Sequence, residues 1–459
     1  MVISEAAPHR DIRQAVDGAF TSDTLASFTR AFAADGANRV VQNAVTQVTV
    51  DDVALNRDVL THTDHTFSCQ LDDWPATNQK KSGRCWLFAG LNLLRPGAMT
   101  AMRLKEFEFS QNYLLFWHKL ERANYVFEAI IETASRPVDD RTIAFLLADP
   151  LPDGGQWNMF AGLITKYGLA PQAAMPETES SSNTQRMNAI LGTIVRQGAQ
   201  RLRALCAEGA DRAQARAAKE ALLRTVHRVL CVHLGTPPDR FAWQWRDADK
   251  GFHRAEEMTP QQFAAAFVTL PLDDYVCLVH DPRPSSPLGR TFAVEYLGNI
   301  VGGARVTYLN VEIALMKGLT RRALLDGEPV WFGCDVGKQM RRDLGLWDAH
   351  MFEYEAVYQT AFTLDKAARL EYQETQMTHA MLFTGVDVVG DDVRRWRVEN
   401  SWGTDNGQQG FYTMNDSWYD EYIFEIAARK ESLPPELRAA LDEEPLILPA
   451  WDPMGALAR

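Results

Sequence analysis

The sequence predicts an α+β protein in which a helix-rich first part is followed by a strand-rich last part. The chain has 459 residues, 46% of them hydrophobic and 23% charged, as in ordinary globular proteins. Before about residue 260, apolar residues recur mostly at helical spacing. After Gln261, short apolar or alternating runs lie between Pro, Gly and Asn clusters, which is typical of strands and turns. The length suggests roughly three domains.

Two helices are predicted in the first part. Residues 85–95 are apolar on several faces and are followed by Pro96-Gly97, which predicts a short, mostly buried helix ending there. Ser110 is a good N-cap for a longer helix, whose apolar positions include Tyr113, Leu114, Trp117 and Leu120. The polar run 177–183 (Glu-Thr-Glu-Ser-Ser-Ser-Asn) then predicts a surface loop dividing two regions.

Residues 186–233 form an Ala/Arg/Leu-rich stretch that is again predicted to be helical. This stretch carries nine Lys and Arg but only three Asp and Glu, a local charge of +6 in an acidic protein. This charge has three interpretations: a solvated helix face, a subunit interface or a contact with a polyanion.

Six segments are predicted as strands in the last part. They are short, and Pro, Gly, Asn or Asp clusters such as Gly-Asp-Asp and Gly-Thr-Asp-Asn-Gly separate them. Their ranges are 275–280, 291–297, 305–311, 380–389, 394–399 and 410–414.

Charge and cysteine usage restrict the class of protein. The net charge of −13 disfavours tight non-specific binding of nucleic acid. No apolar stretch is long enough to span a bilayer, and the first residues do not resemble a signal peptide. The six cysteines form no Cys-x-x-Cys pair, which favours a reducing compartment. We therefore expect a cytoplasmic protein without membrane contact.

Several common catalytic motifs are absent from the sequence. It contains no His-Glu-x-x-His, no Gly-x-x-x-x-Gly-Lys-Ser/Thr, no Gly-x-Gly-x-x-Gly and no Gly-x-Ser-x-Gly. His62 and His65 are the closest histidine pair, and we expect them to be loop residues. Neither a metal site nor an organic cofactor is predicted.

The segment Asn78-Gln-Lys-Lys-Ser-Gly-Arg-Cys-Trp-Leu-Phe-Ala89 places Cys85 where a glycine-containing loop becomes a helix. Backbone N–H groups and the helix dipole at such a position favour thiolate over thiol. Gln79 can direct its side-chain amide toward the same point as an oxyanion donor. For a cysteine considered alone, a buried residue filling the helix start is the alternative.

A histidine and an asparagine complete this set far downstream. His379 opens one predicted strand, and Asn400 follows the next, in Glu-Asn-Ser-Trp-Gly. Neighbouring strands would set the Asn400 amide against His379, fixing the tautomer so that the other ring nitrogen faces the sulfur. Trp402 would keep water from that hydrogen bond. Gln, Cys, His and Asn-Ser-Trp-Gly in this order predict nucleophilic catalysis by a cysteine.

These residues resemble the papain family of cysteine peptidases. Ser82-Gly-Arg-Cys-Trp86 matches the family's Cys-Gly-Ser/Ala-Cys-Trp/Tyr signature. Ser82 replaces the first cysteine, a disulfide partner in secreted relatives, in keeping with a reducing compartment. His379 lies 294 residues after Cys85, about 150 more than in papain, which demands large insertions between the two halves of the papain-like core.

The chain resembles in particular the bleomycin hydrolase and aminopeptidase C branch of these peptidases, from about residue 50 onward. The segments that carry this resemblance are 110–117, 153–157, 333–338, 377–381, 415–422 and the terminal 451–458. The resemblance implies an intracellular cysteine aminopeptidase that acts on peptides with free N-termini, and on bleomycin-type amides as a further substrate class. It also implies a homohexamer with active sites facing an internal chamber.

The resemblance assigns a role to each candidate site residue. Cys85 is the nucleophile, His379 the acid/base and Asn400 its orienting residue, with Gln79 as oxyanion donor. The substrate-binding residues are Gly154, Gly155 and Ala458, although a simple turn is the alternative for the two glycines. Gly154 and Gly155 would align the substrate backbone as a short added strand, because the missing side chain permits close approach.

Five segments follow from this interpretation. They are an N-terminal segment (1–60), a papain-like helical half with Cys85 (61–176), an inserted helical and hairpin region (177–330), a β-barrel-like half with His379 and Asn400 (331–445) and a C-terminal arm entering the active site (446–459).

Two other functions compete with the aminopeptidase. One is a catalytically weak scaffold or nucleic-acid-binding ring that uses residues 186–233, which the complete Gln/Cys/His/Asn set and the acidic charge disfavour. The other is an endopeptidase, which the terminal arm disfavours.

Overall fold

The computed structural model describes residues 18–71 and 74–458, and the chain divides into two compact units. Among the described residues, the smaller unit comprises residues 18–60 together with residues 352–362. Its helices are α1 (Ser22–Ala34), α2 (Gly36–Val45), α3 (Val50–Ala54) and α14 (Tyr354–Tyr358). The Tyr354 hydroxyl donates to Asp51 at 2.5 Å, which ties α14 to α3 although 303 residues separate the two side chains. Helix α4 (Arg57–His62) leads out of this unit.

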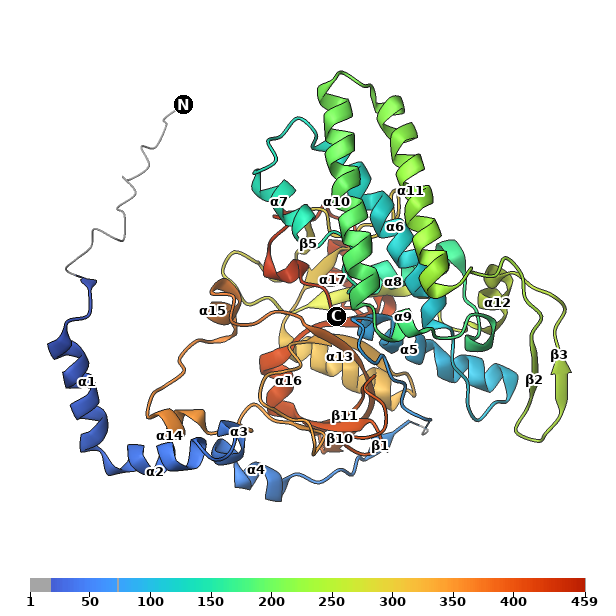
Figure 1. Cartoon of the computed structure of the whole chain (residues 1–459). Coiled ribbons are helices and arrows are strands. Elements are labelled where there is room, and N and C mark those ends of the chain that lie inside the picture. The colour runs from blue at the N-terminus through green and yellow to red at the C-terminus, as the bar shows by residue number, and fades with distance from the viewer. Residues whose placement is uncertain (1–17, 72–73, 459) are drawn as a thin grey trace. The chain divides into compact units, whose positions relative to one another are not determined.

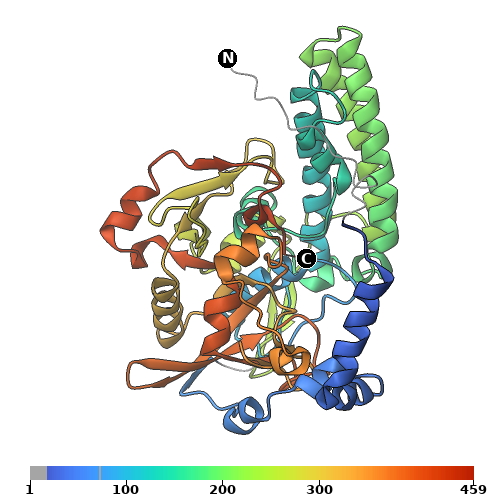
Figure 2. The same cartoon turned by 90° about the vertical axis from the view of Figure 1, so that its left-hand side faces the viewer.

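The larger unit contains the remaining helices. Their bounds are α5 (Cys85–Met102), α6 (Gln111–Glu132), α7 (Arg141–Ala148), α8 (Trp157–Tyr167), α9 (Glu179–Ser182), α10 (Gln185–Ala207), α11 (Arg212–Leu234), α12 (Pro260–Phe267), α13 (Ile313–Leu325), α15 (Lys366–Glu371), α16 (Asp416–Tyr422) and α17 (Pro435–Ala440). Helix α6 begins as predicted, because the Ser110 hydroxyl accepts a hydrogen bond from the Tyr113 N–H at 3.0 Å. The predicted helical stretch 186–233 is an antiparallel hairpin of α10 and α11, which stands beside α6 (Figures 1 and 2).

The end of α5 differs from the prediction. The helix continues through Pro96 and Gly97 to Met102, where Arg103 in a left-handed conformation ends it. Ala98 and Met102 are buried at helical spacing, and their burial stabilises the extra turn beyond the proline. A Cβ at Gly97 would lie 2.1 Å from the Thr269 hydroxyl oxygen, so the glycine permits close packing here and does not stop the helix.

One large mixed sheet dominates the larger unit. Its strands run in the order β14-β5-β6-β4-β13-β7-β10-β11-β12-β9-β8, and β1 pairs with β10. The bounds are β1 (Cys69–Gln70), β4 (Tyr275–Val279), β5 (Thr291–Val294), β6 (Tyr308–Asn310), β7 (Val330–Cys334), β8 (Met340–Arg341), β9 (Leu346–Trp347), β10 (His379–Val389), β11 (Asp392–Glu399), β12 (Phe411–Asn415), β13 (Ile423–Arg429) and β14 (Leu446–Leu448). A separate hairpin joins β2 (Gln244–Arg246) to β3 (Phe252–Arg254).

The α+β prediction is confirmed, and each of the six predicted strands overlaps an observed one. Two central strands, β7 and β13, were not predicted. Both are apolar and almost entirely buried, and such short runs do not alternate in polarity along the sequence.

The two hydrophobic cores of the larger unit meet where α5 crosses the sheet. One core lies among α5, α6, α8 and the α10–α11 hairpin, and Cys85 belongs to it. The other lies between the central strands and helices α13 and α16, and Cys334 belongs to it. Cys334 pairs across β7 and β10 with His379. The first turn of α5 is thereby brought to the beginning of β10.

Candidate active site

Cys85 is the first residue of α5, as predicted, and its side chain is completely buried. The backbone N–H groups of Cys85, Trp86 and Ala380 hydrogen-bond the sulfur. Ala380 directly follows His379 at the start of β10. Packing of α5 on the sheet therefore brings the predicted nucleophile to the mouth of the strand that carries the predicted base.

His379 and Asn400 form the hydrogen bond expected from neighbouring strands. Strands β10 and β11 are antiparallel neighbours, and His379 Nε2 lies 2.9 Å from Asn400 Oδ1. Because an amide oxygen only accepts, Nε2 carries the proton and Nδ1 is left as the base. The Trp402 ring lies 5.0 Å from the imidazole, centre to centre, and covers it.

The Gln79 amide is held from both ends. Its Oε1 accepts a hydrogen bond of 2.6 Å from the Ser401 hydroxyl, and its Nε2 donates to the Ser82 carbonyl at 2.5 Å. The amide nitrogen therefore faces the loop that leads into Cys85, and its second N–H is available to an oxyanion. Ser401 was not singled out as a site residue, although the Asn-Ser-Trp-Gly motif contains it.

Burial sets the resting protonation of the pair. It raises the pKa of the Cys85 thiol to about 12, although the three backbone N–H groups at the sulfur oppose that shift. It also lowers the pKa of His379 to about 4, against the hydrogen bond to Asn400. Burial therefore opposes the thiolate that the helix dipole alone favours, and it also opposes protonation of the imidazole. A thiolate requires transfer of the proton to His379.

The C-terminal arm contacts Gly155, one of the two predicted substrate-binding glycines. The Gly155 N–H donates to the Ala458 carbonyl at 3.2 Å, in an antiparallel bridge. Nearby, Gln156 Nε2 donates to the Ala456 carbonyl at 2.6 Å. A Cβ at Gly155 would lie 2.5 Å from the Trp86 ring, so glycine is needed here for close packing against that side chain. Gly154 is buried beside it, and Ala458 is completely buried. The end of the arm is thus bridged to Gly155, one of the two glycines predicted to bind substrate.

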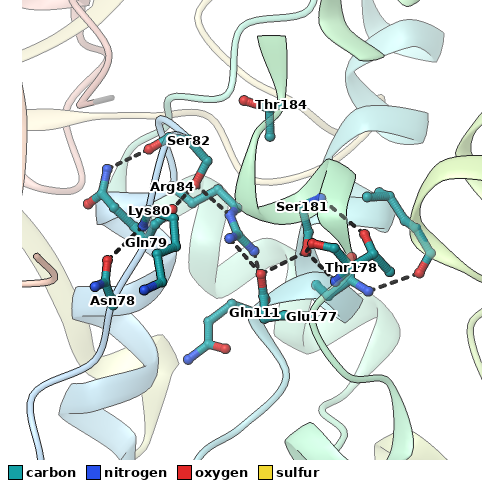
Figure 3. Close-up of polar contacts among 12 residues, drawn as sticks. Asn78, Gln79, Lys80, Ser82, Arg84, Gln111, Glu177, Thr178, Ser181 and Thr184 are labelled. Atoms are coloured by element: carbon teal, nitrogen blue, oxygen red, sulfur yellow. Dashed lines mark hydrogen bonds and ion pairs between the residues drawn. The ribbon is translucent and has the colours of Figure 1, made fainter. Parts of the chain in front are cut away.

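A buried ion pair fixes the loop before the nucleophile. The Arg84 guanidinium is completely buried and contacts Glu177 through both terminal nitrogens, at 2.8 and 2.7 Å (Figure 3). Its Nε donates to the Ser82 hydroxyl, which itself donates to the Gln79 carbonyl. The Glu177 carboxylate also accepts from the buried Ser181. Position 82, a cysteine in the papain signature, serves here as a hydrogen-bonding residue.

The polar run 177–183 is therefore more than the surface loop that was predicted. Ser181 is completely buried, and Thr178 caps the short helix α9. The Lys81 N–H donates to the Ser182 carbonyl at 2.9 Å, which joins the run to the loop before Cys85. The run is polar because its side chains pair with buried groups.

Asp153 connects the nucleophile loop to the substrate glycines. Its carboxylate accepts from the Gly83 N–H at 3.1 Å and pairs with the buried Lys119 at 2.7 Å. Burial opposes ionisation, but Lys119 and hydrogen bonds from Thr184 and Asn188 hold the pKa of Asp153 below its usual range. The Asp153 carbonyl accepts from the Trp86 indole at 2.8 Å. The sequence offered Asp153 within the Asp-Gly-Gly-Gln-Trp segment, without a role.

Glu399 anchors the end of β11, one residue before Asn400. Its buried carboxylate pairs with Arg95 at 2.7 Å and accepts from Asn92 at 2.8 Å, both on α5. The nucleophile helix and the strand that presents Asn400 are thus tied together. The only sign of these contacts in the sequence is that a charged residue, Glu399, directly precedes the Asn-Ser-Trp-Gly motif.

No metal cluster accompanies these residues. Within residues 18–71 and 74–458, no group of three His, Cys, Asp or Glu side chains could hold a metal ion. His62 ends α4 and is not in a loop as predicted, whereas His65 contacts the Thr413 hydroxyl at 2.7 Å. All six cysteines are free thiols. None of the helices in the described part of the chain is long and apolar enough to cross a bilayer.

Comparisons with known proteins agree with this geometry. Residues 19–455 match the Peptidase C1-like family. The chain is 41% identical to bleomycin hydrolase of Gallus gallus, over 96% of this chain and 99% of that protein. It is 40% identical to aminopeptidase C of Lactobacillus delbrueckii subsp. lactis, over 95% and 98% of the two chains. The crystal structure of PepW from Lactobacillus rhamnosis matches with a TM-score of 0.94 at 42% identity, over 96% and 100%. The predicted papain-like fold is confirmed, and the chain belongs to the Peptidase C1-like family of cysteine peptidases.

Proposed function

We propose that this protein is a cysteine aminopeptidase that releases N-terminal residues from peptides, with amides of the bleomycin type as further substrates. The observation that carries the proposal is the bridge between Gly155 and Ala458, next to Trp86, the residue that follows Cys85. The arm occupies part of the path of an extended peptide, so a substrate can bind only up to the point where the arm ends.

The chemistry is acyl transfer to sulfur followed by hydrolysis. His379 Nδ1 accepts the Cys85 proton, and the thiolate attacks the scissile carbonyl carbon. The Cys85 N–H and the Gln79 amide stabilise the oxyanion of the tetrahedral intermediate. His379 then protonates the leaving amine, and the C–N bond breaks to give a thioester. Water, deprotonated by His379, hydrolyses the thioester and restores the thiol.

The arm explains the preference for a free N-terminus. We expect the carboxylate at the end of the arm, which lies outside the described residues, to supply a negative charge suited to the α-ammonium group of a substrate. A charge-assisted hydrogen bond contributes about 1.5–3 kcal/mol. The arm also obstructs any peptide that would extend past that point.

The decisive experiment compares hydrolysis of an aminoacyl amide with hydrolysis of its N-acetylated counterpart. We expect the free amine to be preferred by about 10–100-fold in kcat/KM, with no turnover by Cys85→Ala. Equal rates on the two substrates would contradict the aminopeptidase assignment and leave a general cysteine peptidase.

The proposal extends to the oligomeric state of the protein and its location in the cell. A cytoplasmic homohexamer, with its sites opening into a shared chamber, would restrict access further. Equilibrium sedimentation tests the oligomer.

The nucleic-acid-binding alternative is not favoured by the contacts of the α10–α11 hairpin. Five of the nine basic side chains of residues 186–233 bond to groups of this same chain. They are Arg196, Arg203, Arg216, Lys219 and Arg224. Electrophoretic mobility shift at low salt tests this alternative.

A further inference from the structure

The C-terminal arm is attached to the fold by a buried ion pair at its base. Arg283 donates to Asp452 through both terminal nitrogens, at 3.1 and 2.8 Å. Less than a tenth of either side chain is exposed. Two parallel charge-assisted hydrogen bonds fix the orientation of the Asp452 carboxylate as well as its position.

Arg283 is itself rigidly held on its other side. Its Nε and a terminal nitrogen donate to Asp281, at 2.8 to 3.2 Å. Asp281 accepts from the Ser286 hydroxyl at 2.6 Å, and its N–H donates to the Asn310 side chain at 2.9 Å. Asn310 is the last residue of β6, so these hydrogen bonds anchor the guanidinium to the main sheet.

Asp452 also shapes the arm that follows it. Its side chain accepts from the Met454 N–H at 2.9 Å and caps the short 3-10 helix η6 (Pro453–Gly455). Met454 is buried in the first hydrophobic core. Beyond this turn, the Ala456 and Ala458 carbonyls bond to Gln156 and Gly155. Five residues (453–457) therefore separate Asp452 of the ion pair from Ala458, which forms the bridge to Gly155.

We propose that Arg283 and Asp452 are positioning residues that determine the exopeptidase specificity of this enzyme. By fixing the start of a short arm, their ion pair fixes the register at which the arm ends beside Gly155. An extended chain that slips by one residue moves by about 3.3 Å, more than a hydrogen bond tolerates. Slippage would displace Ala458 from Gly155 and so weaken the obstruction of longer peptides and the preference for a free α-ammonium group. This inference rests on the proposed function.

The test is Asp452→Asn in the full-length enzyme, because the asparagine oxygen can keep the cap on Met454 while the charge and the second acceptor for Arg283 are removed. Arg283→Lys is the second variant, since lysine keeps the charge but loses the two-pronged geometry. Glu443→Gln, which removes one carboxylate from the exposed Arg290–Glu443 pair, is the matched control. An enzyme lacking residues 454–459 gives the substrate preference expected when the arm is absent. For each, kcat/KM is measured on an aminoacyl amide and on its N-acetylated counterpart, with thermal unfolding as the check of folding.

We expect Asp452→Asn to lower the ratio of free-amine to blocked-substrate kcat/KM by about tenfold, toward the value of the truncated enzyme. Arg283→Lys should shift the ratio in the same direction, and the control should keep the wild-type ratio. The two activities should change in opposite directions, whereas a loosened fold lowers both. An unchanged ratio in both arm-base variants, with a changed ratio on truncation, would overturn this proposal alone. An unchanged ratio on truncation would overturn it together with the gatekeeping role of the arm.

Discussion

Arg84, the residue immediately before the nucleophile, is completely buried and pairs with Glu177 through both terminal nitrogens of its guanidinium. The pair joins the loop before α5 to a polar segment 93 residues further along the chain. A buried cation is stable only when it is paired. The position of Cys85 therefore depends on a carboxylate that takes no part in the chemistry.

Glu177→Gln should destabilise the protein. Loss of one partner of a buried pair costs about 3–5 kcal/mol, and the partial exposure of Glu177 reduces this to roughly 2–3 kcal/mol. Urea unfolding measures the change, with Glu179→Gln as a control at an exposed position. Equal stability of the two variants would mean that water or another group satisfies Arg84.

Cys85→Ala should abolish hydrolysis and labelling by iodoacetamide at the active site, while the fold stays intact. The thiol is a small part of a large core, so its removal leaves the packing nearly unchanged. Peptide mapping of the labelled protein identifies which cysteines react. Cys69→Ala, which removes a partly buried cysteine, is the control. More than trace activity in Cys85→Ala would exclude this residue as the nucleophile.

His379→Ala should reduce kcat more than Asn400→Ala. Loss of the acid/base costs about 10²–10⁴-fold, whereas loss of the hydrogen bond at Nε2 costs about 10–100-fold, because Trp402 still covers the ring. Single-turnover rates on an aminoacyl amide measure both variants. Equal losses with unperturbed folding would contradict the two assigned roles.

Removal of the arm should change the type of peptidase. Deletion of residues 454–459 removes the contacts of Ala456 and Ala458 with Gln156 and Gly155. Activity on aminoacyl amides should fall about 10–100-fold, and cleavage of N-blocked or internal bonds should rise. A truncated enzyme with the parent's ratio of the two activities would show that the arm does not select substrates.

The terminal Arg459 extends one residue beyond the matched motif and lies outside the described residues. An arm in an active cleft is placed to lose this residue by self-cleavage, which would expose Ala458 as the new terminus. Intact-mass measurement of wild type and Cys85→Ala checks this, since only the wild type should lack one arginine. Identical masses would mean that no self-trimming occurs.

Acid should destabilise the protein through its buried neutral histidines. Burial lowers the pKa of His118 to about 3 and of His379 to about 4, whereas an unfolded histidine titrates near 6.5. Between pH 6.5 and 4 the unfolded state therefore binds more protons than the folded state, and the free energy of unfolding decreases as the pH is lowered. Each histidine contributes roughly 2–3 kcal/mol to this loss.

His118→Gln tests this, because His118 packs against the Trp86 ring and has no assigned catalytic role. Urea unfolding at pH 7 and pH 4.5 should show a shallower pH dependence than wild type. His62→Gln, at an exposed position, is the control and should keep the wild-type slope. If all three proteins show the same pH dependence of the free energy of unfolding, groups other than His118 cause the acid sensitivity.

The sequence by itself determined the local parts of this site. A glycine-containing loop before an apolar run determines a helix start at Cys85, and strand boundaries place His379 and Asn400 at facing strand ends. The order of Gln, Cys, His and Asn-Ser-Trp-Gly predicted the chemistry, because these residues together point to nucleophilic catalysis although a cysteine alone has a structural alternative.

Only the tertiary structure decided what surrounds these residues. The partners in the Arg84–Glu177 and Arg283–Asp452 pairs lie 93 and 169 residues apart, and no periodicity along the chain connects such positions. The same holds for the bridge between Gly155 and Ala458 and for the pKa values of Cys85 and His379. Burial and ion pairing arise from the closure of long chain segments onto one core, so they become visible only when the packed fold is known.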